Sequence, residues 1–125
     1  MIEALAATTF LALALMAFAA NTVGLTRNER SANNTSVAHA LAQQRLEQLR
    51  SMQLGAAQLN PGLYNDGTLK ADGTATGPFT RTYQVSANNS PTFGLRTVTV
   101  TVSWRDPRQH TTRLSAFVRC STIPC

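Results

Sequence analysis

Proline is absent from this chain before Pro61. Because proline is the residue that most strongly interrupts a helix, its absence allows one continuous helix from Met1 to about Gln53. At about 1.5 Å per residue such a helix is roughly 80 Å long, which is more than the rest of the chain could cover. A helix of that length attached to so small a remainder indicates a subunit of an assembly.

Charged and aromatic residues are scarce, at 14% and 6% of the 125 residues, with a single tryptophan. Hydrophobic residues make up 43%, and much of that share lies within residues 1–20. A chain of this length forms one domain at most beyond its N-terminal stretch. The core left for that domain is thin, so we expect a partner surface or a covalent link to support it.

Cysteine occurs only as Cys120 and Cys125, at the C-terminal end. A structural zinc site needs four ligands, and His39 and His110 lie far from this pair in the sequence. A small disulfide loop in an oxidising compartment is the favoured interpretation, and two free thiols in a cytosolic protein are the alternative.

Catalytic and metal-binding motifs are also lacking. Asp66 and Asp72 lie in glycine-rich turn sequence and do not have the spacing of a calcium-binding loop. No Ser-His-Asp or Cys-His set has support from the pattern of residues. We therefore expect no enzymatic activity, no metal and no cofactor.

Lysine occurs once, as Lys70, so arginine supplies nearly all of the positive charge behind the net charge of +5. The arginines are spread from Arg27 to Arg119 without a dense basic run. A basic surface for nucleic acid is one interpretation of this excess. The preferred interpretation is a set of scattered, solvated arginines that includes partners for neighbouring subunits.

An uncharged apolar run extends from Ala4 to Ala20, about 26 Å as a helix, which is at the short limit for a membrane span. It is either a retained membrane helix or a secretory signal cleaved after Ala19. The acidic start and the helical sequence beyond Ala20 disfavour the signal. Glu3 either remains at the membrane interface, where a negative charge suits the start of a helix, or has a function that requires it beside the apolar run.

The second part of the predicted helix, residues 21–53, has two halves. Asn21 to Ser36 is rich in weak helix formers, so we expect a kink or local unwinding there. From about Val37 the pattern becomes amphipathic. The face predicted to pack on a sheet carries Leu41, Leu46, Leu49 and Met52.

Residues 54–78 are expected to form a loop between helix and sheet, with at most a very short strand or hairpin at Thr68–Lys70. Residues 79–125 are predicted to form an antiparallel sheet that ends in the cysteine loop. Alternating patterns indicate the strands Phe79–Val85, Leu95–Trp104 and Thr112–Cys120, joined by Ser86–Gly94 and Arg105–His110. The predicted fold is α+β: a long N-terminal helix with a hydrophobic first half, packed through its second half on a three- or four-stranded antiparallel meander.

The chain resembles the type IV pilin family. Met1-Ile2-Glu3-Ala4-Leu5-Ala6-Ala7 is similar to the start of the family's hydrophobic helix, and Ala38–Arg50 resembles the end of that helix in minor pilins and pseudopilins. The resemblance covers the whole chain in architecture and is specific in the first fifty or so residues. Glu3 matches the glutamate that the family carries shortly after its leader cleavage site.

The resemblance implies a leader peptide that a prepilin peptidase removes and a methylated mature N-terminus. Compared with the family pattern, the leader, its glycine and about two mature residues are absent ahead of Met1, so we expect the true start to lie upstream of Met1. Arg27 and Arg30 follow the apolar run, and the positive-inside rule would leave the domain in the cytoplasm. A basic leader would reverse that expectation.

The resemblance also implies partners and a location. Residues 1–20 would anchor the subunit in the lipid of the inner membrane, as a single pass with the C-terminal domain in the periplasm, and would then pack into the core of an extracellular filament. Other pilin subunits and the inner-membrane assembly machinery are the expected partners. Glu3 would pair with the terminal amine of an adjacent subunit and so check the axial register. The residues expected in the filament core are Ile2, Leu5, Phe10, Leu11, Leu13, Leu15 and Phe18.

Within the family, the segment Leu41–Arg50 is most similar to minor pilins of the PilV kind, which act in pilus initiation or near the tip. Minor pseudopilins of type II secretion are the alternative. DNA-binding competence pilins are a third interpretation, which the arginine content keeps open.

Overall fold

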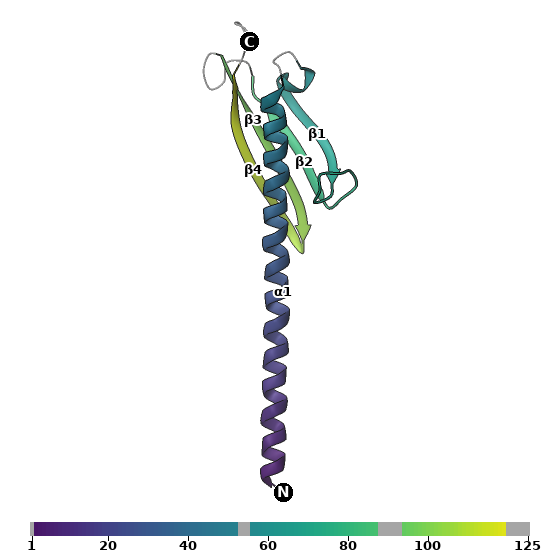
Figure 1. The fold of residues 1–125 in the computed structure, drawn as a ribbon, viewed down its shortest axis with the longest axis vertical. Helices are drawn as coiled ribbons and strands as arrows, with labels where there is room; N and C mark the ends of the chain where they lie inside the picture. Colours follow the sequence, from purple (N-terminus) through teal and green to yellow (C-terminus); the bar gives the residue numbers. More distant parts are fainter. Residues whose placement is uncertain (1, 53–55, 88–93, 120–125) are drawn as a thin grey trace. The chain divides into compact units, whose positions relative to one another are not determined.

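The computed structural model describes residues 2–52, 56–87 and 94–119. They form helix α1 (Ile2–Ser51), a short 3-10 turn η1 (Ala57–Leu59) and strands β1 (Gly62–Leu69), β2 (Phe79–Val85), β3 (Leu95–Asp106) and β4 (Arg108–Arg119). The strands form one antiparallel sheet in the order β1-β2-β3-β4 (Figure 1). The predicted α+β fold with an antiparallel meander is confirmed, and the meander has four strands.

The chain divides into two compact units, Met1–Asn33 and Asn34–Cys125. In the first unit the side chains of residues 6–19 are all exposed. The sequence predicts a membrane span in residues 1–20. Within the described part of the chain, no helix is long and apolar enough to cross a membrane.

Helix α1 is continuous from Ile2 to Ser51, so the local unwinding predicted between Asn21 and Ser36 is wrong. Asparagine, threonine and glycine each cost a helix about 1 kcal/mol or less, and elongation of a formed helix is cooperative. Thr22 also satisfies its hydroxyl within the helix, because Oγ1 donates to the carbonyl oxygen of Phe18 at 2.9 Å. Weak propensity without proline is therefore insufficient to interrupt this helix.

The core of the second unit lies between the end of α1 and one face of the sheet, which the helix crosses in Figure 1. The predicted helix face is confirmed: Leu41, Leu46 and Leu49 are buried, and Met52 is partly buried. Buried residues from the sheet complete this core, namely Phe79, Tyr83, Val85, Val98, Val100, Val102, Trp104 and Val118. Alternation along the strands places these side chains inward and leaves threonine and serine on the opposite face.

The predicted connection Arg105–His110 is wrong, because β3 continues to Asp106 and β4 begins at Arg108. The register pairs Asp106 with Arg108, so Pro107 alone separates the two strands. The register also pairs Trp104 with His110, and their rings stack with centroids 5.4 Å apart. The predicted connection Ser86–Gly94 lies mostly outside the described residues.

The predicted loop 54–78 is wrong over its middle part, which contains η1 and strand β1. The register of β1 against β2 shifts between Asn65 and Gly67, and Gly67 has a φ of 84°. This β-bulge interrupts the alternation that identifies a strand in a sequence. The short strand predicted at Thr68–Lys70 covers only the end of β1.

The return from β1 to β2 requires a glycine at position 77. A Cβ built on Gly77 would lie 2.0 Å from the backbone oxygen of Leu69, because the chain runs back beside β1 with Thr76 N donating to Thr68 O at 2.9 Å. We expect Gly77→Ala to lower the free energy of unfolding by about 2 kcal/mol, because one of two backbone segments must move. Urea unfolding followed by Trp104 fluorescence measures the loss.

Ala71→Gly, in the exposed part of the same turn, is the matched control and should cost less than about 1 kcal/mol. Equal midpoints for Gly77→Ala and the unsubstituted chain would show that the turn relaxes without cost.

Candidate subunit interface

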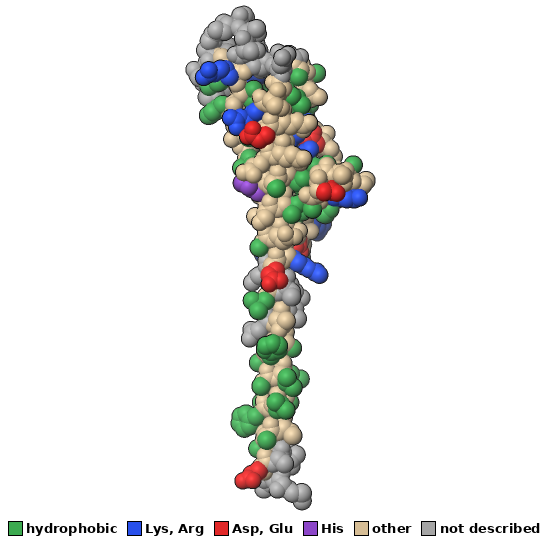
Figure 2. Space-filling model, in the orientation of Figure 1, with side chains coloured by type: hydrophobic (Ala, Val, Ile, Leu, Met, Phe, Trp, Pro, Cys, Tyr) green, Lys and Arg blue, Asp and Glu red, His purple; other side chains and the backbone are tan. Residues whose placement is uncertain are grey.

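The first half of α1 carries a run of large apolar side chains, here called the apolar segment. Its members are each between 61% and 74% exposed: Phe10, Leu11, Leu13, Leu15, Met16 and Phe18. Figure 2 shows apolar side chains gathered along this part of the helix, with an acidic side chain near the helix start. An exposed apolar run of this size indicates a surface that another molecule covers.

The apolar segment has no polar side. Residues two apart in an α-helix point about 200° from one another, that is, to nearly opposite faces. Leu11 and Leu13 form one such pair, and Met16 and Phe18 form another. A helix that is hydrophobic on all sides is suited to burial on all sides, as in the core of a large assembly or in lipid, rather than to docking on one surface.

Burial of the apolar segment would release a large free energy. Complete burial of a leucine, phenylalanine or methionine side chain contributes about 1.5–3 kcal/mol. The segment therefore offers on the order of 10 kcal/mol before the entropic cost of association is subtracted. That amount is of the same order as the cost of association, so burial of the segment would be a major favourable contribution to assembly.

Most of the residues predicted to lie in a filament core belong to the apolar segment. The structure brings Phe10, Leu11, Leu13, Leu15 and Phe18 together in consecutive turns of the helix. The side chains of Ile2 and Leu5 lie outside those that the structure describes. Met16 and the 64% exposed Leu25 were missed. Met16 stands in the same uncharged run and could have been included, whereas Leu25 has no apolar pattern around it.

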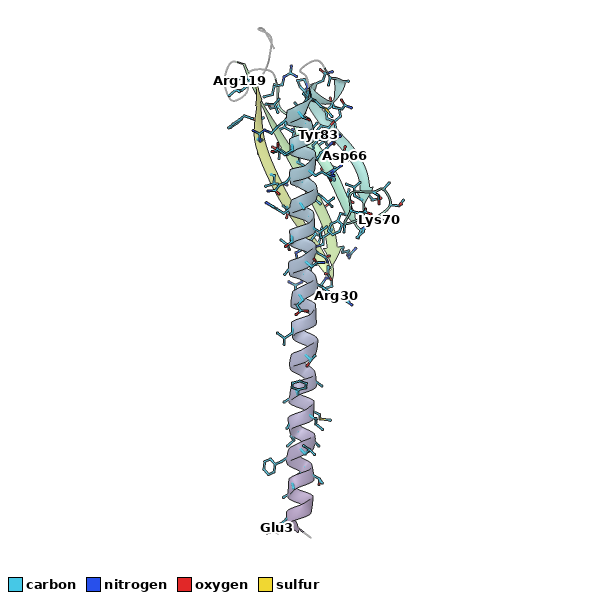
Figure 3. The ribbon with its side chains drawn as sticks, viewed as in Figure 1. Glu3, Arg30, Asp66, Lys70, Tyr83 and Arg119 are labelled. Carbon is cyan, nitrogen blue, oxygen red and sulfur yellow. The ribbon has the colours of Figure 1, made fainter. Side chains whose placement is uncertain are left out.

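Glu3 lies in the first turn of α1 and is exposed (Figure 3). The next charged residue along the chain is Arg27, so Glu3 stands alone beside the apolar segment. A carboxylate in the first turn is stabilised by the helix dipole. If this end of the helix is buried in an assembly, the carboxylate requires a cationic partner from another chain, because an unpaired buried charge is costly.

A charged cluster in the second unit holds the end of α1 to the sheet. Asp66 of β1 accepts two hydrogen bonds from arginines: Arg45 Nη2 of α1 to Oδ1 at 2.9 Å and Arg81 Nε of β2 to Oδ2 at 2.8 Å. All three side chains are nearly buried, with 11–13% exposed. Arg81 Nη1 also donates to the carbonyl oxygen of Leu41 on α1 at 3.2 Å. The cluster therefore connects the helix to two strands.

Two tyrosines adjoin this cluster, and Figure 3 shows Tyr83 and Asp66 beside the helix. Tyr64 and Tyr83 stack with ring centroids 4.7 Å apart and 7° between their planes. The Arg45 guanidinium lies 4.9 Å from the Tyr83 ring centroid, a cation–π contact. Burial raises the pKa of the Tyr83 hydroxyl, and the positive charge of Arg45 opposes that rise. The cation–π contact and the ion pair of Arg45 hold α1 against this face of the sheet.

A buried arginine also secures η1. Arg96 of β3 is 9% exposed, and its Nη1 donates to the carbonyl oxygen of Leu59. Arg45, Arg81 and Arg96 are thus structural, so the prediction that the arginines are scattered solvated positions is wrong for these three. Arg81 shares the inward register of Phe79 and Tyr83, which was the available signal that its head group needs an internal partner.

The two aspartates singled out in the sequence have separate surroundings. Both oxygens of Asp66 accept from arginine. Asp72 is exposed, and its Oδ1 accepts from the Thr74 hydroxyl at 2.7 Å and the Thr74 N–H at 2.9 Å. The bond from the Thr74 hydroxyl is the main cause of the lowered pKa of Asp72. The structure therefore does not bring the two carboxylates to one site.

Comparisons with protein-family models, curated proteins and solved structures found no match for this chain. Cys120 and Cys125, predicted to form a disulfide, lie outside the described residues. The absence of enzymatic activity, metal and cofactor remains a prediction.

Proposed function

We propose that this chain is a structural subunit of a type IV pilus-like filament, and that it acts as a minor pilin in assembly initiation or at the tip. The observation that carries the proposal is the apolar segment, exposed on every side of a helix whose other half forms the spine of a small sheet domain. Parallel packing of such helices buries the segment all round, while the sheet domains remain accessible. The similarity of Met1–Ala7 and Ala38–Arg50 to pilin sequences supports this function.

Before assembly, the same helix end would hold the subunit in the inner membrane with its C-terminal domain in the periplasm. The uncharged run from Ala4 to Ala20 supports this step, because lipid and neighbouring helices are both apolar surroundings. Transfer from lipid to the filament core then exchanges one apolar environment for another. Other pilin subunits and the membrane-bound assembly machinery are the partners that such a transfer requires.

In this proposal, Glu3 sets the axial register by pairing with a terminal amine of a neighbouring subunit. Glu3→Ala should reduce incorporation into surface filaments by at least about tenfold, because the neighbouring amine would be buried without a counter-charge. Immunoblotting of sheared filaments against whole-cell levels measures incorporation.

Glu29→Ala is the matched control, since Glu29 is exposed on the same helix and lies beyond the apolar segment. Both variants should accumulate in cells to the same level. Normal incorporation of Glu3→Ala would remove the register role while leaving the helix-core proposal intact.

A pseudopilin of type II secretion is the alternative within the same class, and the same helix would serve it.

A DNA-binding pilin is a further candidate, favoured by four exposed arginines on one hairpin, Arg105, Arg108, Arg113 and Arg119. Fluorescence anisotropy of labelled DNA with the full chain tests for DNA binding. Binding that weakens steeply with salt supports it, and no binding at low salt rejects it.

A further inference from the structure

Strand β4 forms one edge of the sheet. Among the described residues it pairs with β3 on one side and with no strand on the other. It is 12 residues long, contains no proline, and pairs with β3 without a register shift from Arg119 to Arg108. The opposite edge, β1, has 8 residues and a bulge. Long, regular edges accept additional strands, whereas short or bulged edges resist them.

The free backbone groups of this edge can be assigned from the hydrogen bonds of Thr97. Its N–H donates to Ser86 Oγ at 2.8 Å, and its carbonyl accepts from Ser86 N–H at 2.9 Å, so both groups point toward the β2 side of β3. In an antiparallel strand the backbone N–H and C=O groups of successive residues point alternately to the two neighbouring strands. The even-numbered residues of β3 therefore direct these groups toward β4, where the register pairs them with even-numbered residues, such as Val100 with Leu114.

It follows that the odd-numbered residues of β4 direct their N–H and C=O groups away from the sheet. They are Gln109, Thr111, Arg113, Ser115, Phe117 and Arg119, and their side chains are all exposed. On the inward face, Leu114 and Ala116 pack against the core but remain only partly buried. A further strand would satisfy the free backbone groups and complete the burial of these two residues.

The charge of the edge selects the kind of strand. Residues 108–119 carry three arginines and no acidic residue, so two copies of β4 would repel one another. We propose that the β4 edge binds an extended, acidic segment of a different protein by strand addition. In antiparallel register, acidic residues stand opposite Arg119 and Arg113, and apolar residues stand opposite Ala116 and Leu114.

This geometry defines a peptide. Read from the residue opposite Arg119 to the residue opposite Arg113, the pattern is acidic, any, any, apolar, any, apolar, acidic. Backbone pairing supplies affinity, and the alternate side chains supply specificity. The inference is independent of the proposed filament function, because it concerns only the sheet of the second unit.

The test uses the full chain in detergent micelles and a labelled peptide Glu-Thr-Thr-Val-Thr-Val-Glu, with a version carrying lysine in place of glutamate as the control. Saturable binding of the acidic peptide is expected, with slowed hydrogen exchange at the N–H groups of Arg113, Ser115, Phe117 and Arg119. The even-numbered amides of β4 should already be protected in the free chain. Absence of binding, or binding without new protection at the odd-numbered amides, overturns the proposal.

Three variants sharpen the test. The double variant Arg113→Glu, Arg119→Glu should weaken binding of the acidic peptide by at least about tenfold and gain binding of the lysine peptide, because both cross-strand pairs reverse. Ser115→Pro should abolish binding, since it removes an edge N–H that β3 does not use. Ser115→Ala keeps that N–H and should bind normally, although it loses the hydroxyl contact with Thr99 at 2.9 Å. Lysine-peptide binding that fails to appear in the double variant would contradict the register.

Discussion

Leu13→Glu is expected to abolish incorporation of the subunit into filaments. Leu13 is 64% exposed in the apolar segment, and Leu11 and Leu15 both point to nearly the opposite face of the helix from Leu13. No rotation of the helix therefore removes position 13 from a fully surrounding core. A carboxylate buried there without a partner costs several kcal/mol per subunit, comparable with much of the free energy that the segment offers. Sheared filaments, quantified by immunoblot, provide the measurement.

Leu63→Glu is the control for this prediction, because it makes the same chemical change at a leucine that is 75% exposed on β1. This variant should incorporate normally, and both variants should be present in whole cells. If Leu13→Glu subunits enter filaments at the unsubstituted level, position 13 is not enclosed and the helix-core proposal fails.

Asp66→Ala is expected to lower the free energy of unfolding of the second unit by about 3 kcal/mol. It removes the shared acceptor of Arg45 and Arg81, which leaves two nearly buried guanidinium groups close together without a counter-charge. Breaking a buried ion pair by removal of one partner costs about 3–5 kcal/mol, and the 11–13% exposure of these groups favours the lower end. Urea unfolding followed by Trp104 fluorescence measures the change.

Asp72→Ala is the matched control: an aspartate in the neighbouring turn that is exposed and bonds only locally to Thr74. Its removal should cost about 1 kcal/mol or less. A second comparison is Asp66→Asn, which keeps an acceptor oxygen and should be less damaging than Asp66→Ala. A loss for Asp66→Ala no greater than that for Asp72→Ala would show that the cluster does not hold the helix to the sheet.

The parts of the fold that follow a regular period were predictable from the sequence. The face containing Leu41, Leu46 and Leu49 repeats at helical spacing, and the run from Val98 to Trp104 alternates strictly, so both were placed correctly. Each pattern needs only local sequence to be recognised. The layered arrangement followed, because one amphipathic helix face was the sole cover available for one apolar sheet face.

Strand β1 was not predictable in the same way. Its residues Asn65, Asp66 and Gly67 are typical of turns, and the bulge at Gly67 removes the alternation that would indicate a strand. What makes the segment a strand is its pairing with β2, an interaction between parts of the chain that local patterns do not encode. The continuity of α1 past Gly24 likewise exceeded what local propensity indicated.

The burial of Arg45, Arg81 and Arg96 depends on partners distant in the sequence. Arg81 reaches Asp66 only because the β1–β2 register brings them together, and Arg96 reaches the Leu59 carbonyl only because η1 lies over the sheet. The number of arginines in a sequence does not distinguish buried from exposed positions, so all of them are predicted at the surface. The exposed arginines that remain on the β3–β4 hairpin are the ones available to a partner.

The most direct measurement of the central proposal is mass spectrometry of surface filaments sheared from cells that produce the tagged chain. The predicted result is an intact subunit in the filament fraction, with peptides that retain the apolar segment from Phe10 to Phe18, and its loss from that fraction in the Leu13→Glu variant. A chain found only as a free secreted protein that begins after Ala19 would contradict a role for this helix in a filament core.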